Sequence, residues 1–261
     1  MRRAARFFIS LAALICTCAQ AHAEDPEIAK RRAAERKVFT DAEIFDGLFR
    51  TAFGAEMRIA GRVDGIRKYD TPVRVYVENR ARPDRSAQIA DLVADIKSRI
   101  EHIDIAMVMD RKDANVIVRL VNERDFYPTL RKVYGRDRTR KIQKSLDPQC
   151  LSGFRKDAAL RIVHSDVYLV ADQGDFIFYD CAYEELLQSL GPINDTGKVP
   201  WTMFNDDVQM GFFDIYDQYI LNVLYHPKIR PGMSRREVRA LLPEIMPDVR
   251  AFVARVNNLK P

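Results

Sequence analysis

The stretch CAYEELLQSLGPIND, residues 181–195, decides the expected fold because it joins a helical pattern to an abrupt stop. Across residues 176–190, large apolar side chains recur at steps of three and four and fall on one stripe of a helical wheel. Gly191 and Pro192 follow directly and end the pattern. The sequence therefore predicts a helix over residues 176–190 that packs one side against a core.

A polar flank runs beside the apolar stripe of this helix. Cys181, Glu184 and Gln188 share one face at helical spacing. The wheel places Glu185 further out, away from the core. These polar side chains are the first candidates for a functional site.

The spacing of the flank resembles the long motif of zincin metallopeptidases, H-E-x-x-H-x-x-G-x-x-H. In that motif three His hold zinc and the Glu activates water. Glu185 and Gly191 stand in register with the Glu and Gly of the motif. The three His positions hold other residues, namely Glu184, Gln188 and Asn194.

Ligand chemistry argues against zinc at these positions. Zinc prefers imidazole and thiolate, so one carboxylate and two amides lack most of the affinity, and we expect no catalytic metal and no cofactor. One alternative stays open: oxygens could hold a hard cation such as calcium, with Glu185 as the general base of an active hydrolase. The oxygen ligands would come from Glu184, Gln188, Asn194 and Asp195.

Apolar patterns elsewhere predict an α+β protein. The expected strands cover residues 73–77, 103–109, 115–121 and 160–170. The expected helices cover residues 26–53, 89–100 and 213–225. A last helix follows Ser234, because Glu237 three residues later completes a capping box.

The order of these elements resembles the upper half of a zincin. A mixed sheet with a long backing helix and an active-site-type helix is expected, and residues 213–225 resemble the helix that closes compact metzincins. This interpretation divides the chain into a helical lead-in at 24–58, a zincin-like α+β domain at 59–230 and a C-terminal helical segment at 231–261.

Residues 1–23 have the pattern of a secretory signal peptide. A basic start is followed by an apolar run at residues 7–19, and small residues precede an expected cleavage between Ala23 and Glu24. The run is too short to cross about 30 Å of hydrocarbon, and no later segment is long enough to span a membrane. We expect an exported protein, periplasmic or extracellular; an uncleaved membrane anchor is the alternative.

Export leaves two cysteines in the mature chain, Cys150 and Cys181, because Cys16 and Cys18 belong to the signal peptide. Two thiols in an oxidising compartment are expected to pair, which would stabilise the fold by roughly 3 to 4 kcal/mol. Two separate buried thiols are the alternative. Cys16 or Cys18 could also carry a lipid anchor, although Ile15 and Thr17 are poor neighbours for a lipid-acceptor cysteine.

Composition and charge exclude several classes of protein. With 47% apolar and 30% charged residues, the chain is a folded globular protein. Removing the three arginines of the signal peptide from the formal charge of +5 leaves +2, which gives no reason to expect nucleic-acid binding. Seven basic residues nevertheless gather within residues 131–144. They predict either contact with an anionic surface, such as phospholipid head groups or cell-wall polymer, or a solvated helix or loop face.

Several short motifs resemble an exported proteobacterial family known as domain of unknown function 2927, over most of the mature chain. The matching positions are Cys150, the run from Cys181 through Glu184, Glu185 and Gln188 to Gly191, Phe204-Asn205-Asp206, Leu224-Tyr225-x-Pro227 and Pro231-Gly232-Met233. The resemblance implies export, in some members as a lipoprotein, and implies no particular activity.

The expected function is therefore that of a degenerate, non-catalytic metallopeptidase-like protein of the cell envelope. It would bind a peptide, an envelope polymer or a protein partner. The expected binding residues are Glu184, Gln188, Asn194 and Asp195, with Trp201 as an aromatic wall. The alternatives are an active hydrolase that uses Glu185 and a structural envelope or lipoprotein-like module.

Overall fold

The computed structural model describes residues 24–54, 64–145 and 149–259. The expected signal peptide, residues 1–23, and its cleavage after Ala23 lie outside the described residues. Within the described ranges, no helix combines the length and the apolar character needed to cross a bilayer.

A five-stranded mixed sheet forms the centre of the molecule, in the order β2-β1-β3-β5-β4. Four strands run parallel, and β4 pairs antiparallel with β5 at one edge. The strands are β1 (Val73–Asn79), β2 (Ile105–Met107), β3 (Val116–Val121), β4 (Cys150–Lys156) and β5 (Ile162–Val170). Val118 lies opposite Val77 and Val167, so apolar side chains meet across neighbouring strands on one face.

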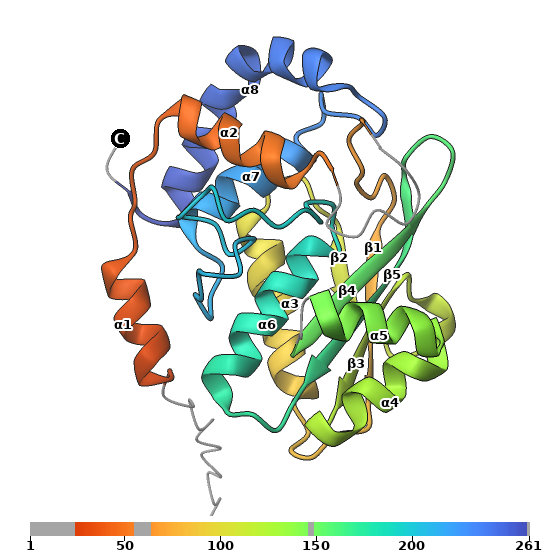
Figure 1. Cartoon of the computed structure of the whole chain (residues 1–261). Helices are drawn as coiled ribbons and strands as arrows, with labels where there is room; N and C mark the ends of the chain where they lie inside the picture. Colours follow the sequence, from red (N-terminus) through yellow and green to blue (C-terminus); the bar gives the residue numbers. More distant parts are fainter. Residues whose placement is uncertain (1–23, 55–63, 146–148, 260–261) are drawn as a thin grey trace, which may run out of the picture.

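The first face of the sheet is covered by α3 (Ser86–Arg99) and α6 (Asp175–Gln188) (Figure 1). Beyond one end of the sheet lie α2 (Asp41–Thr51), α7 (Ile215–Tyr225) and α8 (Arg235–Val256), and α1 (Pro26–Ala34) lies at the flank. Every residue of α7 is buried, which makes this helix the centre of the helical layer. These elements share one large hydrophobic core with the sheet.

The second face carries a separate pair of helices, α4 (Glu123–Tyr134) and α5 (Arg136–Ser145). A smaller hydrophobic cluster, with Phe126, Leu130 and Ile142 on the helices and Tyr168 and Val170 on β5, holds them to the sheet. A short 3-10 turn, η1 (Arg111–Asp113), precedes β3. The pair covers only part of this face, and the ion pairs of Arg119 with Asp166 and Glu78 lie on the remainder.

Most predicted elements are confirmed, including the strands at 73–77, 115–121 and 160–170, the helix at 176–190 and the capping box of Ser234 and Glu237. The single helical lead-in is wrong in detail, because Thr40 and Glu43 form a capping box that starts a second helix. Helices α4 and α5 and strand β4 were not predicted. Polar and glycine residues interrupt their apolar pattern, so local periodicity does not indicate them.

Candidate functional site

Helix α6 carries the candidate site and is joined covalently to the edge strand. Cys181 of α6 forms a disulfide with Cys150, the first residue of β4, with the two Cα atoms 5.8 Å apart. This confirms the predicted pairing of Cys150 with Cys181. The bond holds the middle of α6 against β4.

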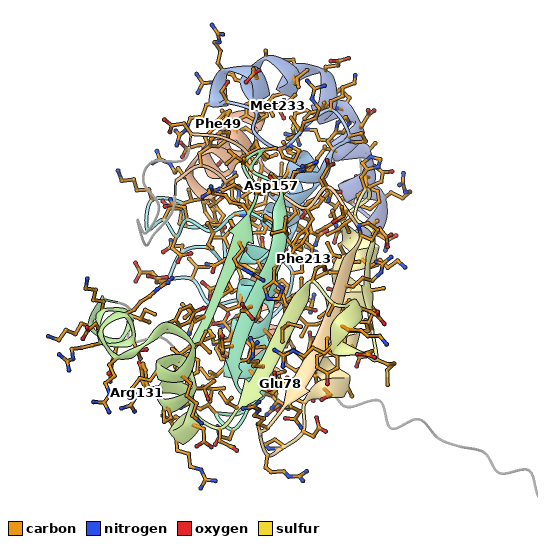
Figure 2. All side chains as sticks on the ribbon, turned by 90° about the vertical axis from the view of Figure 1, so that its right-hand side faces the viewer. Phe49, Glu78, Arg131, Asp157, Phe213 and Met233 are labelled. Atoms are coloured by element: carbon orange, nitrogen blue, oxygen red, sulfur yellow. A yellow bond between two sulfur atoms is a disulfide. The ribbon has the colours of Figure 1, made fainter. Side chains whose placement is uncertain are left out.

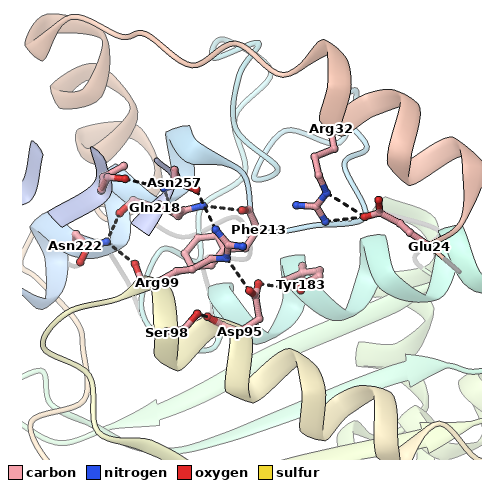
Figure 3. Close-up of polar contacts among 11 residues, drawn as sticks. Glu24, Arg32, Asp95, Ser98, Arg99, Tyr183, Phe213, Gln218, Asn222 and Asn257 are labelled. Carbon is pink, nitrogen blue, oxygen red and sulfur yellow. Dashed lines mark hydrogen bonds and ion pairs between the residues drawn. The ribbon is translucent and has the colours of Figure 1, made fainter. Parts of the chain in front are cut away.

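A polar network fixes α6 from its other side (Figure 3). Tyr183 donates a hydrogen bond to Asp95 of α3 (3.0 Å), and Asp95 also accepts from Arg99 (2.6 Å). Arg99 donates to Asn257 (3.0 Å), which in turn donates to Gln218 of α7 (2.6 Å). Through Tyr183, the residue before Glu184 in the sequence, the helix is thus tied to α3, to α7 and to the end of α8.

Gly191 makes the turn that follows the helix. Its φ of +144° is one that L side chains rarely adopt, and a Cβ there would collide with the carbonyl oxygen of Arg67. Any residue other than glycine would push Arg67 away from the turn. The glycine of the motif is therefore explained by backbone geometry and close packing.

Three carboxylates, one from α6 and two from the connection that follows this turn, converge and form what we call the acidic triplet, Glu184, Asp195 and Asp206. One oxygen from each lies within 4.8 Å of the others. Glu184 and Asp195 are half-buried and Asp206 is exposed. Glu184 and Asp195 were among the predicted binding residues, whereas Asp206 was noted only as part of a family motif. Asp206 lies 22 positions after Glu184, and no periodic pattern relates the two.

The triplet has unfavourable electrostatics when all its members are ionised. Burial raises the pKa of Glu184 well above its usual range, and repulsion from Glu185, Asp195, Asp180 and Asp206 adds to the effect. A proton or another cation at this position relieves the repulsion. The arrangement therefore favours a positively charged ligand.

The loop that carries Asp206 is anchored at both ends. At its start, Asp217 of α7 accepts hydrogen bonds from Thr202 Oγ1 (2.6 Å) and from the next backbone N–H (2.7 Å). At its end, Asp180 of α6 accepts from the backbone N–H groups of residues 210 and 211, at 2.6 and 3.1 Å. These contacts hold Asp206 in place opposite α6.

The two amides at the remaining His positions of the motif have structural partners. Gln188 donates to Asp195 (2.5 Å) and accepts a longer contact from Ser152 of β4 (3.4 Å). Asn194 donates to the carbonyl oxygen of Arg50 at the end of α2 (2.7 Å). Gln188 therefore belongs to the site through Asp195, whereas the Asn194 amide secures the chain to α2.

Glu185 is buried, with 6% of its surface exposed, and is less accessible than Glu184. The expectation that Glu185 points further out is wrong. A helical wheel accounts for one packed side, but α6 contacts β4, β5 and α3 together, so more than one side of the helix is covered.

Trp201, the predicted aromatic wall, packs against the segment between α1 and α2. Its ring lies 6.3 Å from that of Phe39, and the Arg36 guanidinium lies 4.6 Å from its ring centroid. Trp201 is half-buried there, on the loop that leads to Asp206. Its contacts with Phe39 and Arg36 are structural.

The donor set does not fit zinc. No imidazole or thiolate stands at the three His positions, and the Gln188 and Asn194 amides are engaged by Asp195 and Arg50. The acidic triplet instead offers three carboxylate oxygens, the ligand type that hard cations and ammonium or guanidinium groups prefer.

An α/β protein with an acidic site beside a disulfide-fixed helix is the class that this fold and site define. The chain belongs to the family described as protein of unknown function (DUF2927), whose profile matches residues 41–244. That range contains the acidic triplet, the disulfide and Gly191, and it confirms the family resemblance. No curated protein and no solved structure matches the chain.

Proposed function

We propose that this protein is an exported, non-catalytic binding protein that holds an extended peptide segment of an envelope partner. A basic side chain of that segment would enter the acidic triplet. The convergence of Glu184, Asp195 and Asp206 within 4.8 Å carries the proposal. Three close carboxylates make a charge-assisted site for a lysine or arginine of the partner.

The edge strand supports the peptide part of the proposal. Among the described residues, β4 pairs only with β5, so its outer side offers backbone N–H and C=O groups for another strand. Ser152 of β4 contacts Gln188, which bonds Asp195. A strand added at this edge would therefore run close to the acidic triplet.

The zincin-like frame is part of the same proposal. The order of strand β1, helix α3, strands β2 and β3, antiparallel edge strand β4, strand β5 and helix α6 resembles the upper half of a zincin, with α4 and α5 inserted between β3 and β4. Glu185 and Gly191 keep the register of the motif, and the His positions hold Glu184, Gln188 and Asn194. We infer that the frame is that of a metallopeptidase whose metal ligands have been replaced.

A peptide-binding experiment tests this function. Labelled octapeptides with a fixed central arginine should bind, and the same peptides with a central norleucine should bind at least about tenfold more weakly. Asp206→Asn should weaken binding by a similar factor. Asp207→Asn is the matched control, because this exposed neighbour lies outside the triplet. Equal affinities for the two variants would refute the proposal.

The same carboxylates favour one other candidate, a hydrolase with a hard cation such as calcium and Glu185 as general base. Metal analysis of the purified protein, with a broad peptidase screen of wild type and Glu185→Ala, separates the two candidates. The binding function predicts no stoichiometric metal and no cleavage. Bound metal together with Glu185-dependent cleavage would establish the hydrolase instead.

A further inference from the structure

The second face of the sheet carries a strongly basic surface on helices α4 and α5. It consists of Arg131, Lys132, Arg136, Arg138, Arg140, Lys141 and Lys144, all of them exposed. With Asp137 as the single acid, residues 131–144 carry a formal charge of +6. The whole chain carries +5, so everything outside this stretch sums to −1. The positive charge of the protein is concentrated here.

These basic side chains differ from many arginines elsewhere in the molecule, which pair with carboxylates. Arg74, Arg119 and Arg250, for example, each pair with a carboxylate. On the basic surface, six of the seven side chains, all except Lys141, form no ion pair within the described residues. Their charges are therefore available to a partner.

The α5 helix directs its charges outward. Thr139 and Ile142 are buried, with Ile142 in the second hydrophobic cluster, and Arg136, Arg140 and Lys144 repeat every four residues on the opposite side. Like charges at this spacing repel and weaken a helix. This row of like charges therefore does not stabilise the fold, whereas it would strengthen binding to an anionic surface. Figure 2 shows Arg131 on the outer side of the helix pair, away from the sheet.

We infer that this surface docks the protein on a bilayer that contains anionic phospholipid. A two-helix surface with several unpaired cations matches a continuous sheet of phosphate groups, whose attraction acts over about 8–10 Å at physiological salt. Val133, exposed by 52% between these cations, adds an apolar contact at head-group level. Tyr127 and Tyr134 pack against the second cluster, so the surface lacks exposed rings on which bases could stack.

Docking in this way leaves the acidic triplet free. Helices α4 and α5 pack on one face of the sheet and α6 packs on the other (Figure 1). The inference rests on the basic surface alone and does not depend on the peptide-binding function.

Vesicle sedimentation tests the docking surface. The purified protein is mixed with vesicles of phosphatidylcholine alone or of phosphatidylcholine with phosphatidylglycerol. We expect binding only to the anionic vesicles, and loss of that binding when salt is raised to about 0.5 M. The triple variant R136Q/R140Q/K144Q should bind about a hundredfold more weakly.

The matched control R80Q/R111Q/K112Q removes the same number of charges from exposed side chains that form ion pairs. It should bind like wild type. Equal losses in both variants, or equal wild-type binding to neutral vesicles, would overturn the inference. Capture by soluble heparin without sedimentation on anionic vesicles would also overturn it, in favour of a polyanion. The salt dependence of the wild-type protein tests the inference even if the triple variant fails to fold.

Discussion

At the scale of single residues, Glu184 is a position where the fold clearly disfavours the ionised form of a carboxylate. Burial and four neighbouring carboxylates raise its pKa, so the ionised form is disfavoured in the folded protein. In the unfolded chain the same carboxylate ionises near its ordinary pKa of 4.5. Ionisation of Glu184 therefore opposes folding, and the stability that its protonated form contributes is lost as the pH rises above 4.5 through the folded-state pKa.

Glu184→Gln removes that ionisation and should stabilise the protein at pH 8 by on the order of 1 kcal/mol. The difference from wild type should shrink toward pH 4, where Glu184 is protonated in both states. Urea unfolding at the two pH values measures it, with Asp207→Asn as a control for the loss of one exposed charge. A stabilisation of the same size at both pH values would contradict this account.

Gly191 is the second residue whose identity follows from its surroundings. Gly191→Ala should cost about 3 kcal/mol of unfolding free energy, because the new Cβ combines a positive φ with a collision at the Arg67 carbonyl. Gly197→Ala in the same connection is the control, since no atom lies within 4 Å of its Cβ position. Chemical denaturation of both variants measures the contrast, and similar stabilities would show that the turn adapts freely.

At the scale of elements, the pairing of β4 with α6 determines the site. The antiparallel edge strand brings Cys150 to Cys181 and Ser152 to Gln188, so one strand contacts α6 through a covalent bond and a polar contact. The disulfide closes a loop with a sequence separation of 31 residues. In the chain-entropy description, its main effect is to restrict the unfolded chain.

The double variant Cys150→Ala/Cys181→Ala should lose about 3.5 kcal/mol of unfolding free energy. Guanidinium unfolding of the variant and of the oxidised wild type measures the loss. In addition, thiol titration of the unfolded, unreduced protein that starts at Glu24 should find no free thiol. Two reactive thiols in that titration would show that the bond does not form.

At the scale of the whole molecule, buried and paired carboxylates act on stability in opposite directions. Arg36 and Thr40 lower the pKa of Glu43 to about 2, and hydrogen bonds from His164 and Arg119 outweigh burial and lower that of Asp166 to about 2. Such groups stabilise the fold above their unfolded pKa, and this contribution is lost as the pH falls toward 2. Burial raises the pKa of Asp217 to about 6. The stability that its protonated form contributes is therefore lost as the pH rises from 3.8 to about 6.

Together these shifts predict that stability between pH 2 and 7 is greatest at about pH 4–5. Denaturant midpoints across this range measure the curve. Asp217→Asn should flatten the decline between pH 5 and 7, although loss of the Thr202 and Met203 contacts lowers stability overall. A wild-type stability that climbs steadily from pH 4 to 7 would be incompatible with these shifts.

The sequence by itself determined the features that depend on near neighbours. The apolar steps of α6 and its stop at Gly191, the alternation of β1 and the capping box at Ser234 each involve residues a few positions apart. The disulfide was predictable for another reason, because Cys150 and Cys181 are the only cysteines after the predicted signal peptide. For the same reasons, Glu184 and Gln188 could be placed on one flank of a helix from sequence alone.

Tertiary structure alone decided which side chains share the site. Asp206 reaches Glu184 because Asp217 and Asp180 anchor its loop, Asn194 bonds the end of α2, and several neighbouring elements bury Glu185. The α4–α5 pair likewise depends on an apolar cluster to which β3, α4, α5, β4 and β5 all contribute. Periodicity encodes how a side chain is oriented on its own element. The surroundings of that side chain come from segments far away in the sequence, and only packing brings them together.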